Sequence, residues 1–147
     1  MKVFVLQRSA ITRYAGEYPS LSAFLLSAAP TPSDSEQTSF RGEGELTQDE
    51  ERLLLSYREE ESGIRAALSL SDDTLTLTRG GATLCFERGK RTAFTYATAY
   101  GRLPTEAYTE RIELVKKGSA YLITLVYTAV FSGIAQKNEL RFKITVR

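Results

Sequence analysis

The stretch TLTLTRGGATLCFERGKRTAFTYATAYG, residues Thr74 to Gly101, decides the fold. Apolar and polar residues alternate in it in three short runs, as they do in β-strands that bury one face. Glycines separate the runs, with an adjacent pair at Gly80 and Gly81 and a single glycine at Gly89. Adjacent glycines allow positive φ at both central positions of a tight turn. The stretch therefore predicts successive β-hairpins.

The same alternation recurs over most of the chain and predicts about ten short strands. The runs are Lys2–Ile11, Thr38–Leu46, Glu51–Glu60, Ile64–Leu70, Thr74–Arg79, Ala82–Glu87, Thr92–Tyr100, Tyr108–Val115, Ser119–Phe131 and Glu139–Arg147. Short turn segments separate most of them, which favours an antiparallel meander. So long a sheet hides its edges by closing on itself. We therefore expect an all-β, up-and-down barrel of about 8–10 strands, in one domain covering residues 1–147.

The phase of the alternation predicts which side chains face the barrel interior. The expected interior residues include Tyr121, Ile123, Leu125 and Tyr127 in one run, Leu140, Phe142 and Ile144 in a second, and Tyr108, Ile112 and Leu114 in a third. Phe94, Tyr96 and Tyr100 add further rings on one face of Thr92–Tyr100. The interior is therefore expected to be rich in aromatic side chains.

The segment Thr12–Gln37 breaks the pattern, because it contains three prolines and several serines. We expect it to be mainly loop, an insertion between the first two strands. Within it Leu21, Phe24, Leu25 and Ala28 fall on one face of a short helix that Ser20 could cap. A disordered insertion is the alternative interpretation.

The composition excludes several kinds of chemistry. The chain has no histidine, which removes the usual general base and metal ligand and the Ser-His and Cys-His nucleophile systems. Its one cysteine, Cys85, lies within an alternating run and is expected to be a structural or half-buried thiol without catalytic reactivity. We expect no enzyme activity, no metal and no cofactor.

The same composition predicts a cytoplasmic protein. The absence of cysteine pairs fits a reducing compartment. No segment reaches the roughly 20 apolar residues that a transmembrane helix needs, so no membrane association is expected. The net charge of +1 gives no general electrostatic attraction to nucleic acid or to anionic lipid.

Several residues, taken in order, resemble the YwiB-like family, a bacterial domain family without an established activity. They are Tyr57 and Glu59, Arg79 and Gly81, Phe86 and Gly89, then Tyr96, Thr98, Tyr100 and Gly101, and finally Tyr127 on the long strand. The resemblance is loose over Val3–Ile11 and good over Ser39–Val146, and it departs at Thr12–Gln37. It implies a calycin- or lipocalin-like β-barrel, a fold in which many members bind small apolar molecules.

The candidate ligand-binding residues are the aromatic and polar side chains of this set. They are Tyr57, Arg79, Phe86, Phe94, Tyr96, Thr98, Tyr100 and Tyr127. Interior tyrosines suit a cavity with apolar walls and polar tips. They suit equally a filled core in which neighbouring polar groups satisfy the hydroxyls, because a barrel of about eight strands has room for side chains or for one small ligand. Both interpretations stay open at this point.

The glycines and one ion pair complete the set of candidates. Gly81 and Gly89 are interpreted as structural hairpin glycines, because the pattern matches no phosphate-binding motif. Gly101, at the end of the aromatic run, is expected to mark a barrel corner. Glu59 and Arg79 could form a buried ion pair or an acid–base pair, and the sequence does not separate the two.

These features lead to one main functional hypothesis and three alternatives. The main hypothesis is a protein that binds a small apolar or amphipathic molecule inside the barrel. A protein-interaction or oligomeric scaffold, such as a homodimer, is the first alternative. It draws on the segregation of charge between an acidic segment, 34–61, and a basic one, 79–117. Single-stranded nucleic-acid binding and catalysis are the other two, and neither is expected.

Overall fold

Ten strands and one short helix form the described part of the chain. The computed structural model describes residues 1–98 and 101–147, apart from the side chains of residues 96–98. The elements are β1 (Lys2–Tyr14), α1 (Leu21–Leu25), β2 (Pro32–Gln48), β3 (Leu53–Glu59), β4 (Arg65–Ser71), β5 (Thr74–Arg79), β6 (Ala82–Glu87), β7 (Arg91–Thr98), β8 (Gly101–Lys117), β9 (Ala120–Phe131) and β10 (Ile134–Val146). The all-β prediction is therefore confirmed.

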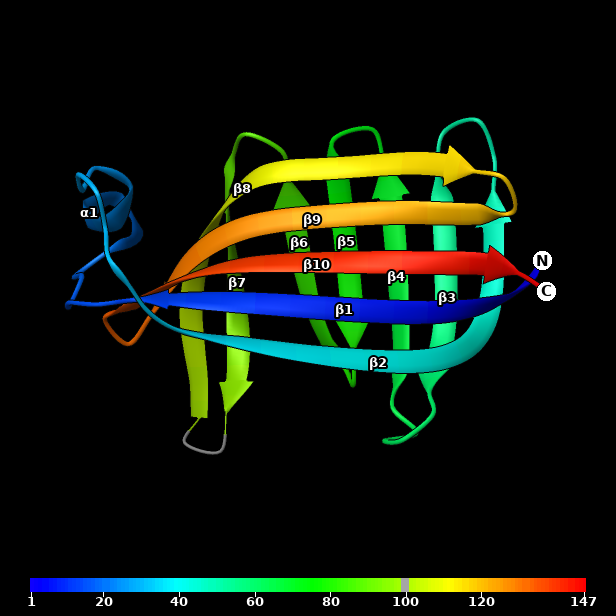
Figure 1. Ribbon diagram of the computed structural model, residues 1–147, viewed down its shortest axis with the longest axis horizontal. Helices are drawn as coiled ribbons and strands as arrows, with labels where there is room; N and C mark the ends of the chain where they lie inside the picture. Colours follow the sequence, from blue (N-terminus) through cyan, green and yellow to red (C-terminus); the bar gives the residue numbers. More distant parts are fainter. Residues whose placement is uncertain (99–100) are drawn as a thin grey trace.

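The strands form one antiparallel sheet with the order β6-β5-β4-β3-β2-β1-β10-β9-β8-β7. Apart from the β1–β10 pair, neighbours in the sheet are neighbours along the chain, which confirms the up-and-down meander. In Figure 1, β8, β9, β10, β1 and β2 cross in front of β3 to β7 at a steep angle. The result is a nearly closed calycin-like barrel. Within the described residues, its one break in hydrogen-bonded neighbours lies between β6 and β7.

The hydrophobic core fills the space between the two layers. Its fully buried side chains include Leu55, Leu68, Leu75, Phe86, Ile123, Leu125, Phe142 and Ile144. Three rings meet at its centre, where the centroid of Phe86 lies 4.6 Å from that of Tyr127 and 6.0 Å from that of Phe94. The interior phases predicted for β9 and β10 are confirmed, and side chains occupy the centre of the barrel.

Strand β2 turns the first corner of the barrel at two glycines. Its first part pairs with β1, while residues 42–48 pair with β3 in the other layer. A Cβ atom at Gly44 would collide with the carbonyl oxygen of Ser56 and would lie 2.7 Å from the Cα atom of Tyr57. A Cβ atom at Gly42 would likewise collide with the carbonyl oxygen of Arg58. Strands that switch sheets need such bends, and glycine allows the close backbone approach.

Strand β8 turns the opposite corner, with a bulge in place of glycines. It pairs with β7 through residues 101–108 and with β9 through residues 107–117, and its register shifts between Thr109 and Arg111. The bulge reverses the phase of the side chains, so that Thr109 and Ile112 both point inward. The prediction that Tyr108 and Ile112 share the inner face is therefore wrong, because strict alternation cannot anticipate a bulge.

The segment Thr12–Gln37 is much less of a loop than predicted. Strand β1 continues to Tyr14 and β2 already begins at Pro32, so that residues 12–14 and 32–37 form a long antiparallel arm. Residues 32–39 are exposed. Because this part of β2 has no buried face, its sequence shows no alternation of apolar and polar residues, which is the pattern that identifies a strand. Arg13 supports the arm with ion pairs to Asp34 and Glu36 at 3.7 and 2.9 Å.

The predicted short helix is present as α1, and the side chain of Ser20 caps it by accepting a hydrogen bond from the backbone N–H of Ala23. Leu21 and Phe24 are buried, whereas Leu25 and Ala28 are exposed, because the helix ends at Leu25. Phe24 packs against Tyr14 and Tyr18 with ring centroids 5.0 Å apart. No helix in the described part of the chain has the length and apolar character to cross a membrane.

Two further predictions need correction. Cys85 is exposed, because it lies on the outward face of β6 and the inward position belongs to Phe86. Gly101 pairs with Thr98 across the β7–β8 hairpin and has a φ of 122°, so it belongs to a hairpin end and the corners lie elsewhere. Gly81 and Gly89 adopt φ values of 88° and 75° in tight turns, as their assignment as structural glycines implies.

The glycine corner makes a testable prediction. Replacing Gly44 by alanine is expected to lower the free energy of unfolding by about 3 kcal/mol or more, because the new methyl group meets the backbone of β3. Urea unfolding followed by circular dichroism measures this change. Gly118→Asn is the matched control, since Gly118 has a φ of 62° in an open turn and asparagine tolerates that conformation. Equal losses in the two variants would contradict the role of the corner.

Candidate functional site

A pocket of about 620 Å³, here called the mouth pocket, opens where β2 passes the ends of the β3–β4 and β5–β6 hairpins. Its apolar wall consists mainly of Ile11, Phe40, Leu77, Leu84, Phe86 and Leu140. It forms there because the first half of β2 pairs with β1 alone, while β3 joins only from Gly42 onward. The pocket therefore lies at one open end of the barrel and reaches the core at Phe86.

A row of polar side chains from β1 and β10 faces the apolar wall. It consists of Gln7 and Ser9 on β1 and of Gln136 and Asn138 on β10. The inward phase of β1 begins with Val3 and Val5, which are buried, and then changes to these polar residues. The inward phase of β10 also changes from apolar to polar, but the two polar segments are offset along the antiparallel pair, since Asn138 and Gln136 lie opposite Ile11 and Arg13. Two adjacent strands thus carry amides where a barrel core normally carries aliphatic groups.

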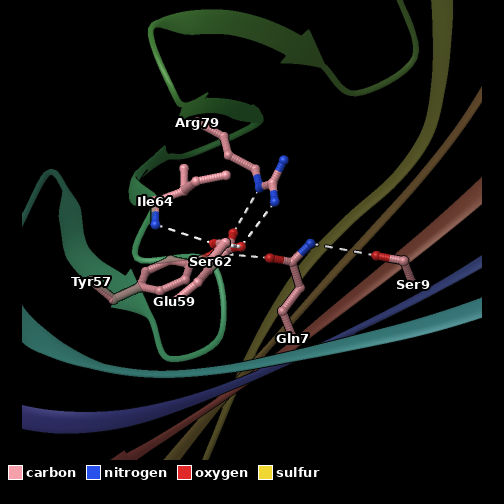
Figure 2. Close-up of polar contacts among 7 residues, drawn as sticks. All are labelled: Gln7, Ser9, Tyr57, Glu59, Ser62, Ile64 and Arg79. Carbon is pink, nitrogen blue, oxygen red and sulfur yellow. Dashed lines mark hydrogen bonds and ion pairs between the residues drawn. The ribbon is translucent and has the colours of Figure 1, made fainter.

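Glu59 and Arg79 form an ion pair at the edge of the mouth pocket (Figure 2). The Arg79 Nε and Nη2 atoms donate to the Glu59 carboxylate at 2.7 and 2.9 Å, and the Ser62 hydroxyl donates to it at 2.9 Å. The Glu59 side chain is 2% exposed, whereas that of Arg79 is 43% exposed. The Arg79 hydrogen bonds lower the pKa of Glu59 below its ordinary value, against the opposing effect of burial. The carboxylate is therefore charged and fully paired.

Arg79, on β5, also contacts residues of two other strands, β2 and β3, at the pocket opening. Its guanidinium carbon lies 5.1 Å from the centroid of the Phe40 ring on β2. The same side chain binds Glu59, which ends β3, so that β5, β3 and β2 meet at one residue. A guanidinium over an aromatic face is attracted to the ring. Of the two predicted roles for this pair, the geometry shows a bidentate ion pair that braces the pocket edge.

Tyr57 holds Gln7 in place from behind the pocket. Its hydroxyl donates to Gln7 Oε1 at 2.8 Å in a buried hydrogen bond. Burial raises the pKa of Tyr57 to about 12, and the negative charge of Glu59 adds to this effect while Arg79 opposes it. The phenol is therefore a proton donor throughout the physiological pH range. This bond directs the other end of the Gln7 amide, Nε2, toward Ser9 Oγ at 3.4 Å.

Asn138 has an amide end without a partner. Gln136 Nε2 donates to Asn138 Oδ1 at 3.1 Å, and Asn138 Nδ2 is buried without a hydrogen bond within the described residues. Exchanging the nitrogen and oxygen of both amides would preserve this bond and again leave one end of Asn138 unpaired. A buried polar atom without a partner costs about 1–3 kcal/mol. The site therefore contains one buried hydrogen-bonding group, Asn138 Nδ2, that no described residue satisfies.

The structure brings together part of the predicted site. Arg79, Phe86 and Tyr127 line the mouth pocket. Tyr57 supports it through Gln7, and Phe94 belongs to the core behind Phe86. The side chains of Tyr96 and Thr98 and the whole of Tyr100 lie outside the described residues.

Sequence reasoning missed the polar row of Gln7, Ser9, Gln136 and Asn138. The available signal was a polar residue in an apolar phase: Gln7 follows Val3 and Val5 at intervals of two, and Asn138 precedes Leu140 and Phe142 in the same way. Glu59 carries the same signal, because it extends the phase of Leu55 and Tyr57. A polar residue on a buried face needs a partner or a ligand, and this rule would have selected these positions.

Comparison with known proteins places the chain in a family. A family model described as "Domain of unknown function (DUF1934)" matches residues 28–141. The chain belongs to this family. Among solved structures, the DUF1934 chain is similar to the ywiB protein from Bacillus subtilis, with a TM-score of 0.65 and 17% identity over 97% of this chain and 92% of that one. At this identity the likeness shows a shared fold. Comparison with curated proteins returns no significant match.

The match confirms the resemblance seen in the sequence of this DUF1934 member. The matched residues begin within the α1–β2 connection and run into β10, so they include both Glu59 and Arg79. The two polar strand segments of the mouth pocket differ, since Gln7 and Ser9 precede the matched residues while Gln136 and Asn138 fall within them. The similarity in structure to the ywiB protein extends over nearly the whole chain and shows that β1 is part of the shared fold.

The depressed pKa of Glu59 predicts a pH-dependent stability. Because the folded protein binds this proton more weakly than the unfolded chain, the contribution of Glu59 is complete above a pH of about 4.3 and is lost as pH falls through the folded pKa. Glu59→Gln is expected to lower the free energy of unfolding by about 2 kcal/mol at neutral pH, less than for a fully buried pair because Arg79 is partly exposed.

Urea unfolding between pH 3 and pH 7 tests this prediction. The difference between the wild-type protein and Glu59→Gln should shrink as the solution is acidified below pH 4, since the variant has no carboxyl group to titrate at this position. Glu61→Gln, at an exposed neighbouring position, should change the stability by less than about 0.5 kcal/mol at neutral pH. A difference between the wild-type protein and Glu59→Gln that is constant with pH would rule out Glu59 as the titrating group.

Proposed function

We propose that this protein binds a small amphipathic molecule in the mouth pocket. The observation that carries the proposal is the combination, in one pocket, of an apolar wall with two buried amides, Gln7 and Asn138, the second of which has an unpaired end. Ligand sites in proteins are mostly apolar concave surfaces with a few polar groups that fix orientation. The mouth pocket has this composition, and its volume of about 620 Å³ lies within the usual range for small-molecule sites.

The packing of the barrel favours a site at the mouth over one at the centre. Phe86, Phe94 and Tyr127 pack against one another in the middle of the core. A ligand that enters from the mouth would contact Phe86 and Tyr127 at its inner end, because both residues also line the pocket. The main hypothesis, a ligand inside the barrel, thus becomes a ligand in the mouth pocket, with aromatic contacts at the inner end of the site.

An interaction scaffold is a weaker candidate. The first half of β2 pairs on one edge only and could in principle add a strand from another chain. That edge carries Pro32, Asp34 and Glu36, the residue types with which proteins protect open strands from pairing. Size-exclusion chromatography with light scattering would reveal a stable dimer if this edge, or any other surface, pairs between copies.

Binding of the uncharged dye Nile red provides the test of the ligand-binding function. We expect saturable binding with a rise in fluorescence as the dye leaves water for the apolar wall. Ala82→Trp places a large ring at the lip of the pocket and should weaken binding at least about tenfold, because Ala82 lines the opening.

Thr83→Trp is the matched control, because Thr83 is the next residue on β6, is exposed and does not line the pocket. It should bind the dye like the wild-type protein. Native mass spectrometry of protein purified without detergent adds an independent observation, a co-purified small molecule. Absence of saturable dye binding, or equal binding by the two tryptophan variants, counts against the proposed site.

A further inference from the structure

The mouth pocket is electrically neutral. Arg79 is the one charged side chain among the described residues that line it, and its guanidinium is held by two hydrogen bonds to the Glu59 carboxylate. The two formal charges cancel within the pair. A charged ligand group that entered the pocket would lose its hydration without gaining a net opposite charge, which is strongly unfavourable. An uncharged polar group needs only hydrogen bonds.

With the amides oriented as they are in the structure, the pocket offers hydrogen-bond donors to such a group. Asn138 Nδ2 has no partner within the described residues, and the Asn138 residue is 3% exposed. Gln7 Nε2 is the second donor, because its bond to Ser9 Oγ, at 3.4 Å, is longer than a good N–H···O bond. Tyr57 keeps the carbonyl end of Gln7 occupied, so the N–H end is the one available. Both donors lie on the β1–β10 side, opposite the wall formed by Leu77, Leu84 and Phe86.

From these observations we infer that the ligand is an uncharged amphiphile with a hydroxyl or carbonyl oxygen at its polar end. The oxygen accepts a hydrogen bond from Asn138, and the hydrocarbon part lies against the wall. Gln7 lies opposite Phe142, four residues along β10 from Asn138, and its amide donates to a second oxygen of the polar end where the ligand has one. The inference rests on the proposed ligand-binding function and specifies its ligand class. It distinguishes an alcohol, ester or amide from a carboxylate or an ammonium group of the same chain length, because the Glu59–Arg79 pair leaves no net charge for either ion.

A matched series of ten-carbon amphiphiles tests the ligand class. Monodecanoin, decanoate and decylamine are competed against Nile red at pH 7.5, where the second is an anion and the third a cation. Monodecanoin should displace the dye at a concentration at least about tenfold lower than either ion requires. Displacement by decanoate or decylamine at an equal or lower concentration overturns the inference while leaving the ligand-binding function intact. Failure of Nile red itself to bind counts against the ligand-binding function.

Asn138→Leu tests the polar contact. Leucine has a similar size and cannot form a hydrogen bond, so monodecanoin should bind at least about tenfold more weakly. The affinity of the variant for Nile red is measured first, so that displacement of the dye can be converted to an affinity for monodecanoin. The substitution removes one buried amide end that has no partner and also the acceptor of the Gln136 Nε2 hydrogen bond. Because Gln136 is only partly buried, the net loss in unfolding free energy should be about 1 kcal/mol or less, and the variant is expected to fold. Gln48→Leu is the control, since Gln48 is an exposed amide outside the pocket. Unchanged monodecanoin affinity in Asn138→Leu would show that this amide does not hold the ligand.

Glu59→Gln tests the role of charge cancellation. The substitution keeps the shape of the side chain but leaves the positive charge of Arg79 unbalanced at the pocket edge. The ratio of decanoate affinity to monodecanoin affinity should then rise at least about tenfold, after circular dichroism has confirmed that the variant is folded. A purely structural ion pair would leave this ratio unchanged, and that result would remove the electrostatic basis of the inference.

Discussion

The close approach of the β2 backbone to the β3 backbone at Gly42 and Gly44 is the constraint on which the barrel and its pocket depend. It lets β2 leave the front layer and pair with the rear one. Because pairing with β3 begins only there, the earlier part of β2 keeps an open edge, and the mouth of the barrel lies beside it. Gly42 is also the register partner of Glu59, so the corner that shapes the opening places the carboxylate at its edge.

The polar groups at the mouth are not those that a packed core would select. Gln7, Glu59 and Asn138 are all at most 6% exposed and lie on faces that are otherwise apolar. Buried amides and ion pairs seldom stabilise a fold more than well-packed hydrocarbon would. These three residues lie at one end of the barrel, whereas the other buried polar side chains among the described residues are threonines of β8 and β9, namely Thr105, Thr109 and Thr128.

The sequence predicted the architecture well because the meander rests on local signals. Alternation identified each inner face in β9 and β10, and paired turn residues such as Gly80 and Gly81 identified the hairpins. It failed where the signal was not local. The β8 bulge after Thr109 reverses the phase without any distinctive residue, and the first part of β2 has no buried face to mark it as a strand.

The site was predictable only in part for a related reason. Glu59 and Arg79 were named from the sequence as a possible ion pair or acid–base pair, and the structure shows them as a bidentate ion pair. Gln7 and Asn138 come from β1 and β10, the one neighbouring pair in the sheet that is not adjacent along the chain. That both line one pocket depends on the pairing of β1 with β10, which closes the barrel and which reasoning from one hairpin to the next does not specify. The Tyr57–Gln7 hydrogen bond spans the same kind of long-range contact.

Because, among the described residues, β6 and β7 are not hydrogen-bonded neighbours in the sheet, the barrel is an open sheet whose two end strands can move relative to each other. A fully closed barrel can widen only if the hydrogen bonds between its strands lengthen. A barrel with one such break can widen when the sheet bends. At the β6–β7 turn the two sides of this break are held together, because Gly89 and Lys90 are hydrogen-bonded to the backbone of Thr109 on β8. Residues of both β6 and β7 line the mouth pocket. Bending of the sheet at this break would therefore change the width of the pocket without breaking any strand pair.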